Sequence, residues 1–293
     1  VPTIALARIK ARVPKMPPII YYDAGERDEL NEHWIHVFRP TVVFKQILTP
    51  EVAGAYRGPY IDPRVPVELY PLPLSCPFAH GGPPLVRVFT HSSVFYRPLD
   101  VVSYFGPTWE TRERVQERVT TVVRRLGASG ILRGIISDPE IGFPYFGALA
   151  MARIAVSMRG SGRDTDRYWQ VPALGAALLC DGTMGCVHPY PFRDGATASF
   201  YQTLDELEQK LTTLIADEDM RSAIAGAGKN HLQRFHSVEA RALYFLGVAR
   251  KVIGFCYSQV QEERTSFWRR KLEWPSELPE WRGEVVGFHE GSL

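Results

Sequence analysis

Glycine and arginine residues are concentrated in one short segment, RGSGRDTDR, which spans residues 159–167. Glycine lets backbone amides approach a ligand closely, arginine neutralises negative charge, and a helix that starts here would point its positive end at the same space. The segment therefore predicts a pocket for a diphosphate, although an ordinary strand-to-helix turn has a partly similar pattern. The residues expected to bind the ligand here are Arg159, Gly160, Gly162, Arg163, Asp164, Thr165 and Arg167.

Arg163 and Arg167 lie on either side of the predicted helix start. We expect them to be catalytic, because fixed cations stabilise the charge that grows on a departing diphosphate. The alternative is that both are solvated and pair with Asp164 and Asp166. Residues 164–166 also have the D-x-D spacing of a divalent metal site, but the same residues are suited to cap a helix. We favour capping and predict no metal.

Apolar and amphipathic segments alternate around this loop. The predicted strands cover residues 100–106, 131–137, 154–158 and 176–179, and the predicted helices cover residues 108–127, 143–152 and 165–174. Such alternation is typical of a doubly wound parallel sheet, whose ligands bind beyond the carboxyl ends of the strands. Gly106 ends the first strand and either approaches the phosphates or forms a plain turn. Tyr145 either stacks on a base or packs in the core, and we favour packing.

Three further helices are predicted after the sheet. Thr203 and Glu206 have the spacing of a capping box, and leucines at 204, 207, 211 and 214 form a buried stripe. Residues 219–235 predict the second helix, and Ser237 is expected to start the third.

The first half of the chain is rich in proline and less regular. Residues 17–23 and 41–48 are apolar runs that predict buried strands of a parallel sheet. Residues 56–84 carry so many prolines and glycines that only loops or short edge strands are expected. The predicted parts are an N-terminal domain of residues 1–97, a second domain of residues 98–250, and a C-terminal helix and tail of residues 251–293 that pack back on the first domain.

The composition, 45% hydrophobic and 23% charged over 293 residues, is that of a globular chain with two domains of ordinary size. A net charge of +2, from 34 basic and 32 acidic residues, gives no basis for nucleic acid as a partner. The four cysteines are scattered without metal-ligand spacing, which predicts reduced thiols and a cytoplasmic protein. The basic, aromatic C-terminal tail predicts at most peripheral membrane contact.

Four motifs together resemble one known family. They are the RGSGRDTxR loop, the PALG helix end (residues 172–175), the PFRDG turn (residues 191–195) and the TLDELxxKL helix (residues 203–211). Over roughly residues 98–250 the chain resembles the C-terminal domain of group 1 glycosyltransferases, particularly the CgeB-like branch of the spore-maturation type. The resemblance implies an α/β fold of the GT-B type, with two Rossmann-like domains that face each other across a cleft. The N-terminal domain, which is short or truncated here, would hold the acceptor.

The same resemblance implies a hexosyltransferase-like enzyme. The C-terminal domain would bind a UDP- or GDP-sugar as donor, without a tightly bound cofactor and without a metal. The acceptor would be a glycan, a lipid or a protein. Two alternatives stay open, an exostosin-type glycosyltransferase and a catalytically inactive GT-B protein that binds nucleotide sugars or glycans.

Donor binding in the family uses a glutamate that bonds to the ribose, five positions before the PALG glycine. Gln170 occupies that position, so ordinary hydrogen bonds would replace charge-assisted ones. Gly162 stands where many relatives carry a second acidic residue. In the N-terminal half the resemblance carries over Asp23, Asp28 and Lys45 as candidates. The catalytic base is expected there, and it is either Asp23, which lies at a strand end, or His33 or His36.

Overall fold

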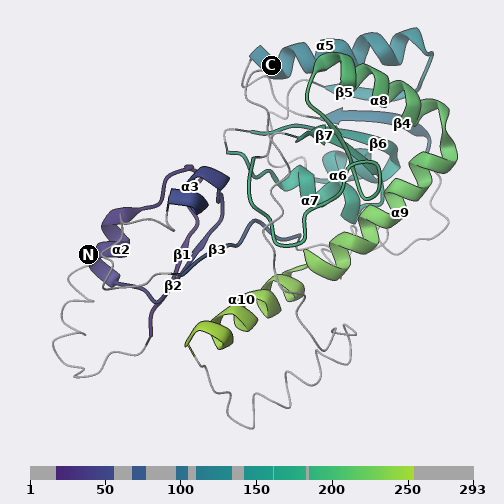
Figure 1. Cartoon of the computed structure of the whole chain (residues 1–293). Helices are drawn as coiled ribbons and strands as arrows, with labels where there is room; N and C mark the ends of the chain where they lie inside the picture. The colour runs from purple at the N-terminus through teal and green to yellow at the C-terminus, as the bar shows by residue number, and fades with distance from the viewer. Residues whose placement is uncertain are drawn as a thin grey trace. The chain divides into compact units, whose positions relative to one another are not determined.

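The chain divides into two compact units (Figure 1). The computed structural model describes residues 18–55, 68–76, 97–104, 110–133, 142–160, 162–182 and 185–253. Unit 1 comprises residues 1–73, 186–189 and 242–285, and unit 2 comprises residues 74–185, 190–241 and 286–293. The domain boundary predicted after residue 97 therefore lies inside unit 2.

Unit 1 contains a parallel sheet of three short strands in the order β1-β2-β3. β1 (Ile20–Asp23) and β2 (Val42–Lys45) confirm the strands predicted from the two apolar runs, and β3 (Glu68–Pro71) is an edge strand beside β2. All residues of β2 are buried, as expected for the central strand of a parallel sheet. The helix α2 (Glu32–Phe38) connects β1 to β2, and α3 (Pro50–Ala55) follows β2.

The helix α10 (Val238–Ile253) begins in unit 2 and continues into unit 1. In unit 1, the rings of Tyr244 and Phe245 lie 6.3 and 4.7 Å from the ring of Phe44 on β2. Ser237 Oγ accepts a hydrogen bond from the amide of Ala240 at 3.1 Å, so the predicted helix start is confirmed. Most of the tail predicted to pack on the N-terminal domain, residues 254–293, lies outside the described residues.

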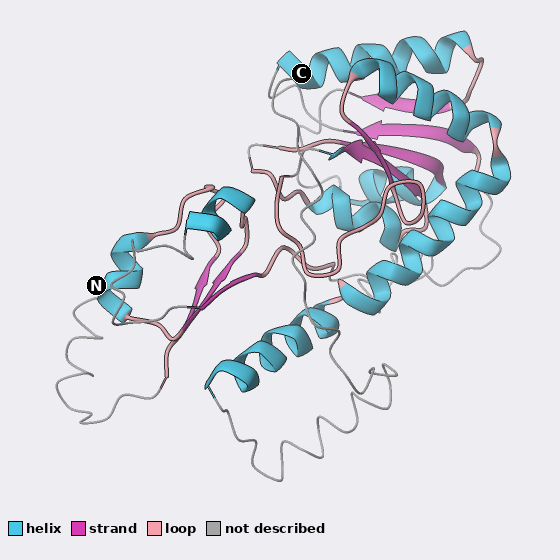
Figure 2. Cartoon of the chain, viewed as in Figure 1, coloured by secondary structure: helices cyan, strands magenta, loops and turns pink. Residues whose placement is uncertain are grey.

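Unit 2 contains a parallel sheet of five strands in the order β5-β4-β6-β7-β8. Strands of this sheet are drawn as magenta arrows between helices in Figure 2. The strands are β4 (Leu99–Tyr104), β5 (Gly130–Arg133), β6 (Ala152–Ser157), β7 (Ala177–Asp181) and β8 (Ser199–Tyr201). The direction of the strand order reverses between β4 and β6, because β5 lies on one side of β4 and all later strands lie on the other.

Helices cover both faces of this sheet, so the predicted doubly wound fold is confirmed (Figure 1). Helices α5 (Glu110–Arg125) and α8 (Leu204–Ala216) cover one face, and α6 (Gly142–Met151), α7 (Asp166–Ala173) and the later part of α9 (Glu218–Phe235) cover the other. Successive strand residues face opposite sides, so Val101 packs beside α5 and Val102 beside α6 and α7. Among the described helices, none combines the length and apolar character needed to cross a membrane.

The start of α8 confirms the predicted capping box. Thr203 Oγ1 accepts a hydrogen bond from the Glu206 amide at 3.1 Å, and Glu206 Oε2 accepts one from the Gln202 amide at 2.7 Å. Leu207, Leu211 and Leu214 are buried, as the predicted stripe requires.

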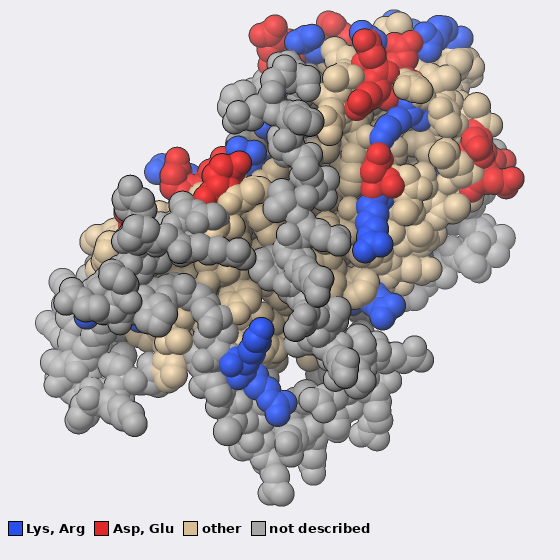
Figure 3. All heavy atoms as spheres, in the orientation of Figure 1, with Lys and Arg blue, Asp and Glu red and all other residues tan. Residues whose placement is uncertain are grey.

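Basic and acidic side chains are mixed on the outer surface of α5 and α8 (Figure 3). Arg118 Nη1 lies 2.9 Å from Asp205 Oδ1 and 2.8 Å from Glu208 Oε2, and Arg125 Nη1 lies 2.5 Å from Glu208 Oε1. Exposed pairs of this kind contribute little to stability, which makes these arginines suitable control positions.

Candidate functional site

The predicted glycine and arginine segment begins in the loop between β6 and α7, residues 158–165, of which all but residue 161 are described. This loop follows β6 at the carboxyl edge of the unit 2 sheet. It stands where the strand order reverses, since β6 neighbours β4 at that point. At such a switch point the loops after the two strands diverge and leave a crevice, in which ligands of open α/β sheets bind. The loop therefore lies at the edge of the sheet where ligands of open α/β folds bind, and its contact with a diphosphate stays a prediction.

The backbone around Arg159 is held from both sides. The Arg159 amide donates to Asp181 Oδ1 and Oδ2 at 3.1 and 3.3 Å, and the Arg159 carbonyl accepts from Arg112 Nε and Nη2 at 3.1 and 2.9 Å. Asp181 ends β7 and Arg112 lies in the first turn of α5, and both side chains are buried. These charge-assisted hydrogen bonds fix the first part of the loop before any ligand arrives.

Gly160 is required by the same arrangement. A Cβ at this position would lie 3.2 Å from Arg112 Nη2. The Gly160 amide donates to the Gly162 carbonyl at 3.1 Å, which closes a tight turn. A side chain here would press on the guanidinium that holds the Arg159 carbonyl, so glycine is explained by a close approach within the protein.

The loop region carries more positive than negative charge. Burial lowers the pKa of Arg112, the positive charge of Arg167 lowers it further, and the carboxylate of Asp181 acts in the opposite direction. A lowered arginine pKa means that the charged form is disfavoured there and gains from a bound anion. Arg163 is half-buried in the same loop. The site is therefore suited to neutralise a phosphate group.

Gln170 is joined to Tyr145 within the site. Tyr145 Oη donates a hydrogen bond to Gln170 Oε1 at 2.8 Å, and burial raises the pKa of Tyr145 although the nearby charge and hydrogen bond of Arg167 oppose this. Tyr145 also packs edge-on against the ring of Tyr104 at 5.4 Å, which confirms the preferred packing role. The Gln170 oxygen that was predicted to bond to a ribose therefore already accepts one hydrogen bond.

Asp164 makes contacts that the sequence did not indicate. Its Oδ2 accepts from the Leu74 amide at 2.6 Å, and its Oδ1 accepts from Trp169 Nε1 at 2.8 Å. Burial raises the pKa of Asp164 to about 6. Thr165 occupies the N-cap position of α7, but its side chain makes no capping hydrogen bond, so the predicted cap is wrong in that respect. Within the described residues, no group of three His, Cys, Asp or Glu side chains is arranged to hold a metal ion.

Asp23, the expected base, lies in unit 1 and pairs with Lys45. Lys45 Nζ lies 3.4 Å from Asp23 Oδ2 and donates to the Gly25 carbonyl at 2.9 Å. The carboxylate also accepts from the amides of Gly25 and Asn31, each at 3.1 Å. Asp23 and Lys45 are 6% and 0% exposed, so the pair is held inside unit 1.

Of the remaining predicted residues, three lie in unit 1 and one lies outside the described residues. His33 and His36 are exposed on α2, and Asp28 is half-buried in the loop before it. Gly106 lies outside the described residues, so its predicted contact with the phosphates stays a prediction.

Arg112 and Asp181 were not identified as site residues from the sequence, although the position of each in the sequence is unusual. Arg112 falls on the same helical stripe as the buried Val115, Val119 and Val122, so an arginine occupies a core-facing position one turn before the valines. Asp181 ends an otherwise apolar strand. A charged residue at the end of a buried stripe or strand marks a candidate site in a parallel α/β fold.

Comparison with known proteins supports a glycosyltransferase fold. HepE from Anabaena, in a structure with UDP and glucose, is 11% identical with a TM-score of 0.51, and the match covers 84% of this chain and 74% of HepE. The GtfA/B complex gives 8% identity and a TM-score of 0.50 over 77% of this chain and 48% of that one. The chain spans 45% of the length of TarM from S. aureus, at 10% identity over 74% of this chain and a TM-score of 0.48.

These likenesses show an α/β fold with two parallel sheets that resembles the GT-B glycosyltransferases. A comparison with curated proteins gives no match. The profile of a family described as glycosyl transferase-like matches residues 101–247, which is half of the chain and includes the whole arginine loop. The chain belongs to this glycosyl transferase-like family.

Proposed function

We propose that the protein transfers a hexose from a nucleoside diphosphate sugar, and that the loop of residues 158–165 holds the diphosphate. The observation that carries the proposal is the Arg159 backbone fixed between Arg112 and Asp181 at the switch point of the sheet. Family membership and the likeness to HepE, which was solved with UDP and glucose, make UDP the first nucleotide to test. The sequence motifs favour the CgeB-like branch of the family.

The chemistry that we propose depends on charge. The bond between the anomeric carbon and the diphosphate oxygen breaks, and its electron pair leaves with the diphosphate. Arg163 and Arg167 would stabilise that growing negative charge, because preorganised cations act strongly in a site that excludes water. Arg112 would act as a positioning residue through the Arg159 carbonyl. We propose that these cations serve in place of a metal ion.

The acceptor supplies the oxygen that forms the new bond to the sugar. We propose a glycan, lipid or protein hydroxyl whose proton passes to a base as the new bond forms. Asp23 stays a candidate for this base, although its pairing with Lys45 favours a structural role.

A direct test measures nucleotide binding by isothermal titration calorimetry with UDP and GDP. Arg163→Ala should weaken binding about tenfold, since it removes one charge-assisted contact. Arg125→Gln is the matched control, because it removes an arginine from the surface of α5. Equal affinity in the Arg163 variant and the wild type would remove Arg163 from the site, and no binding of either nucleotide would overturn the donor assignment.

A second candidate function is binding of a nucleotide sugar without turnover. It is favoured by Gln170, which offers an amide in place of a carboxylate and whose oxygen already accepts from Tyr145. Release of nucleoside diphosphate from a UDP-sugar, measured with and without candidate acceptors, separates the two functions. Nucleotide binding with no release under any condition would favour the binding protein.

A further inference from the structure

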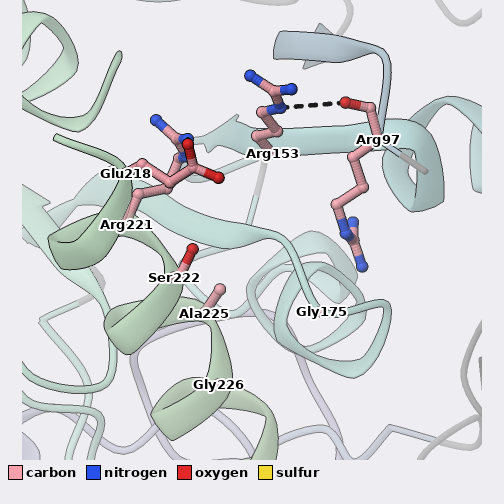
Figure 4. A pocket seen from close by; sticks show the side chains of 8 residues that line it. All are labelled: Arg97, Arg153, Gly175, Glu218, Arg221, Ser222, Ala225 and Gly226. Atoms are coloured by element: carbon pink, nitrogen blue, oxygen red, sulfur yellow. Dashed lines mark hydrogen bonds and ion pairs between the residues drawn. The ribbon is translucent and has the colours of Figure 1, made fainter. Parts of the chain in front are cut away.

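A second hollow lies at the opposite edge of the unit 2 sheet, where its parallel strands begin (Figure 4). Its volume is about 390 Å³, within the usual range for small-molecule sites. Arg97 precedes β4, Arg153 lies near the start of β6 and Gly175 precedes β7, while the other wall is the first part of α9. We call this hollow the amino-edge pocket, and its lining residues are Arg97, Arg153, Gly175, Glu218, Arg221, Ser222, Ala225 and Gly226.

Arg97 forms the fixed part of the amino-edge pocket. Its Nη1 donates to the carbonyls of Ala150 and Ala152 at 2.8 and 2.6 Å, and its Nη2 donates to the Leu174 carbonyl at 2.6 Å. Burial lowers the pKa of Arg97. Arg97 therefore holds the ends of α6 and α7 and adds a positive charge behind the pocket wall.

Arg153 and Arg221 each keep part of the guanidinium available. Arg153 Nε donates to the Arg97 carbonyl at 3.1 Å and Nη1 donates to Asp100 Oδ1 at 3.0 Å, which leaves Nη2 unused among the described residues. Arg221 Nη1 donates to the carbonyls of residues 214 and 215, while its Nη2 lies 3.9 Å from Glu218 Oε2, beyond hydrogen-bonding distance. Figure 4 shows the Arg221 guanidinium beside Glu218, the Arg153 side chain on the side of Arg97, and Ser222 on the α9 wall.

Among the described residues around the amino-edge pocket, basic side chains outnumber acidic ones. The cations include Lys229, whose pKa is lowered by burial and by the positive charge of Arg97. The nearby carboxylates are Asp100, which Arg153 and Ser129 engage, and Glu218, whose side chain is 79% exposed. A solvated carboxylate neutralises a guanidinium weakly and is easily displaced. The pocket therefore favours an anion of higher charge than a carboxylate.

Three small residues line part of the pocket and leave room for the body of a ligand. Ala225 and Gly226 leave space along α9, and Gly175, with a φ of +76°, brings its backbone close to Arg97. Two guanidinium groups and a serine hydroxyl line the same pocket, and donors of these kinds bind the terminal oxygens of a phosphate monoester. The volume is greater than one phosphate group needs, so a compact polar group would lie against the small residues.

We propose that the amino-edge pocket binds a phosphate monoester, with Arg153 Nη2, Arg221 Nη2 and Ser222 Oγ at the phosphate. The ligand is either a soluble phosphorylated metabolite or the headgroup of a phospholipid with a terminal phosphate. This site lies at the edge of the sheet opposite the arginine loop, and it does not depend on the proposed sugar transfer.

Calorimetry on the full chain tests the soluble source with glycerol 3-phosphate as the probe. Binding should persist at saturating UDP, because the two sites lie at opposite edges of the sheet. Arg153→Gln should weaken it about tenfold, while Arg125→Gln, which also removes an arginine paired with a carboxylate, should leave it unchanged. Glu218→Gln should tighten it about threefold, because it removes a competing carboxylate.

Vesicle co-sedimentation tests the lipid source with phosphatidic acid in phosphatidylcholine and with phosphatidylcholine alone. Retention on phosphatidic acid that is lost in Arg153→Gln and kept in Arg125→Gln supports the headgroup. Four results would overturn the proposal: no binding of either probe, displacement of glycerol 3-phosphate by UDP, equal binding by the Arg153 variant and the wild type, or weaker binding by the Glu218 variant. If Arg153→Gln does not fold, the binding measurement on Glu218→Gln still decides the question.

Discussion

Replacing Gly175 by alanine tests how much the hydrogen bonds of Arg97 stabilise unit 2. Gly175 follows the C-cap residue of α7 with a φ of +76°, and an added Cβ would lie 2.8 Å from Arg97 Nη2. That atom donates to the Leu174 carbonyl at 2.6 Å. Alanine adds left-handed strain of about 1–2 kcal/mol and displaces a charged hydrogen bond of about 1.5–3 kcal/mol. The expected loss of unfolding free energy is therefore about 2.5–5 kcal/mol.

Urea unfolding followed by circular dichroism measures this loss. Gly127→Ala is the matched control, because Gly127 has a φ of +62° and an added Cβ would meet no described atom within 4 Å. The control carries only the strain, about 1–2 kcal/mol. The two variants should differ by about 1.5–3 kcal/mol, the contribution of the displaced Arg97 contact. Equal losses in both variants would refute this reasoning.

Three other changes test the site and the unit 1 sheet. Arg112→Gln should raise the dissociation constant for UDP about tenfold in calorimetry, since it releases the Arg159 carbonyl, whereas Arg118→Gln on the same helix should not; identical constants would contradict the positioning role. Because burial raises the pKa of Asp164 to about 6 from 3.8, its protonation stabilises the folded state fully below about pH 4, and this contribution disappears as the pH rises through 6. Wild-type protein should therefore lose more stability between pH 4.5 and pH 7 than Asp164→Asn in denaturant titrations, and parallel profiles would argue against it. Asp23→Asn should destabilise the protein by about 3–5 kcal/mol by leaving Lys45 buried without its partner, and unchanged unfolding with lost donor turnover would instead assign Asp23 to catalysis.

Much of unit 2 could be predicted from the sequence because its signals are local. Apolar runs such as residues 154–158 and the amphipathic stripe of α5 follow the periods of the strand and the helix, and both elements formed where they were predicted. Thr203 and Glu206 are three residues apart, so the capping box could be recognised without any tertiary contact. The glycines and arginines of residues 159–167 identified the loop for the same reason.

The contacts that organise the candidate site join residues far apart in the chain. Arg112 bonds to a carbonyl 47 residues later, and Asp164 accepts from an amide 90 residues earlier. The local pattern assigned Asp164 to a cap or a ligand, but burial beside Trp169 and Leu74 gave it internal partners. Most strands and helices of unit 2, and the strands β1 and β2 of unit 1, could be predicted from the sequence alone, whereas β8 and α3 were not. Only the tertiary structure decided which charges meet, because the strand order sets the switch point and a buried charge must find whatever partner the fold brings near.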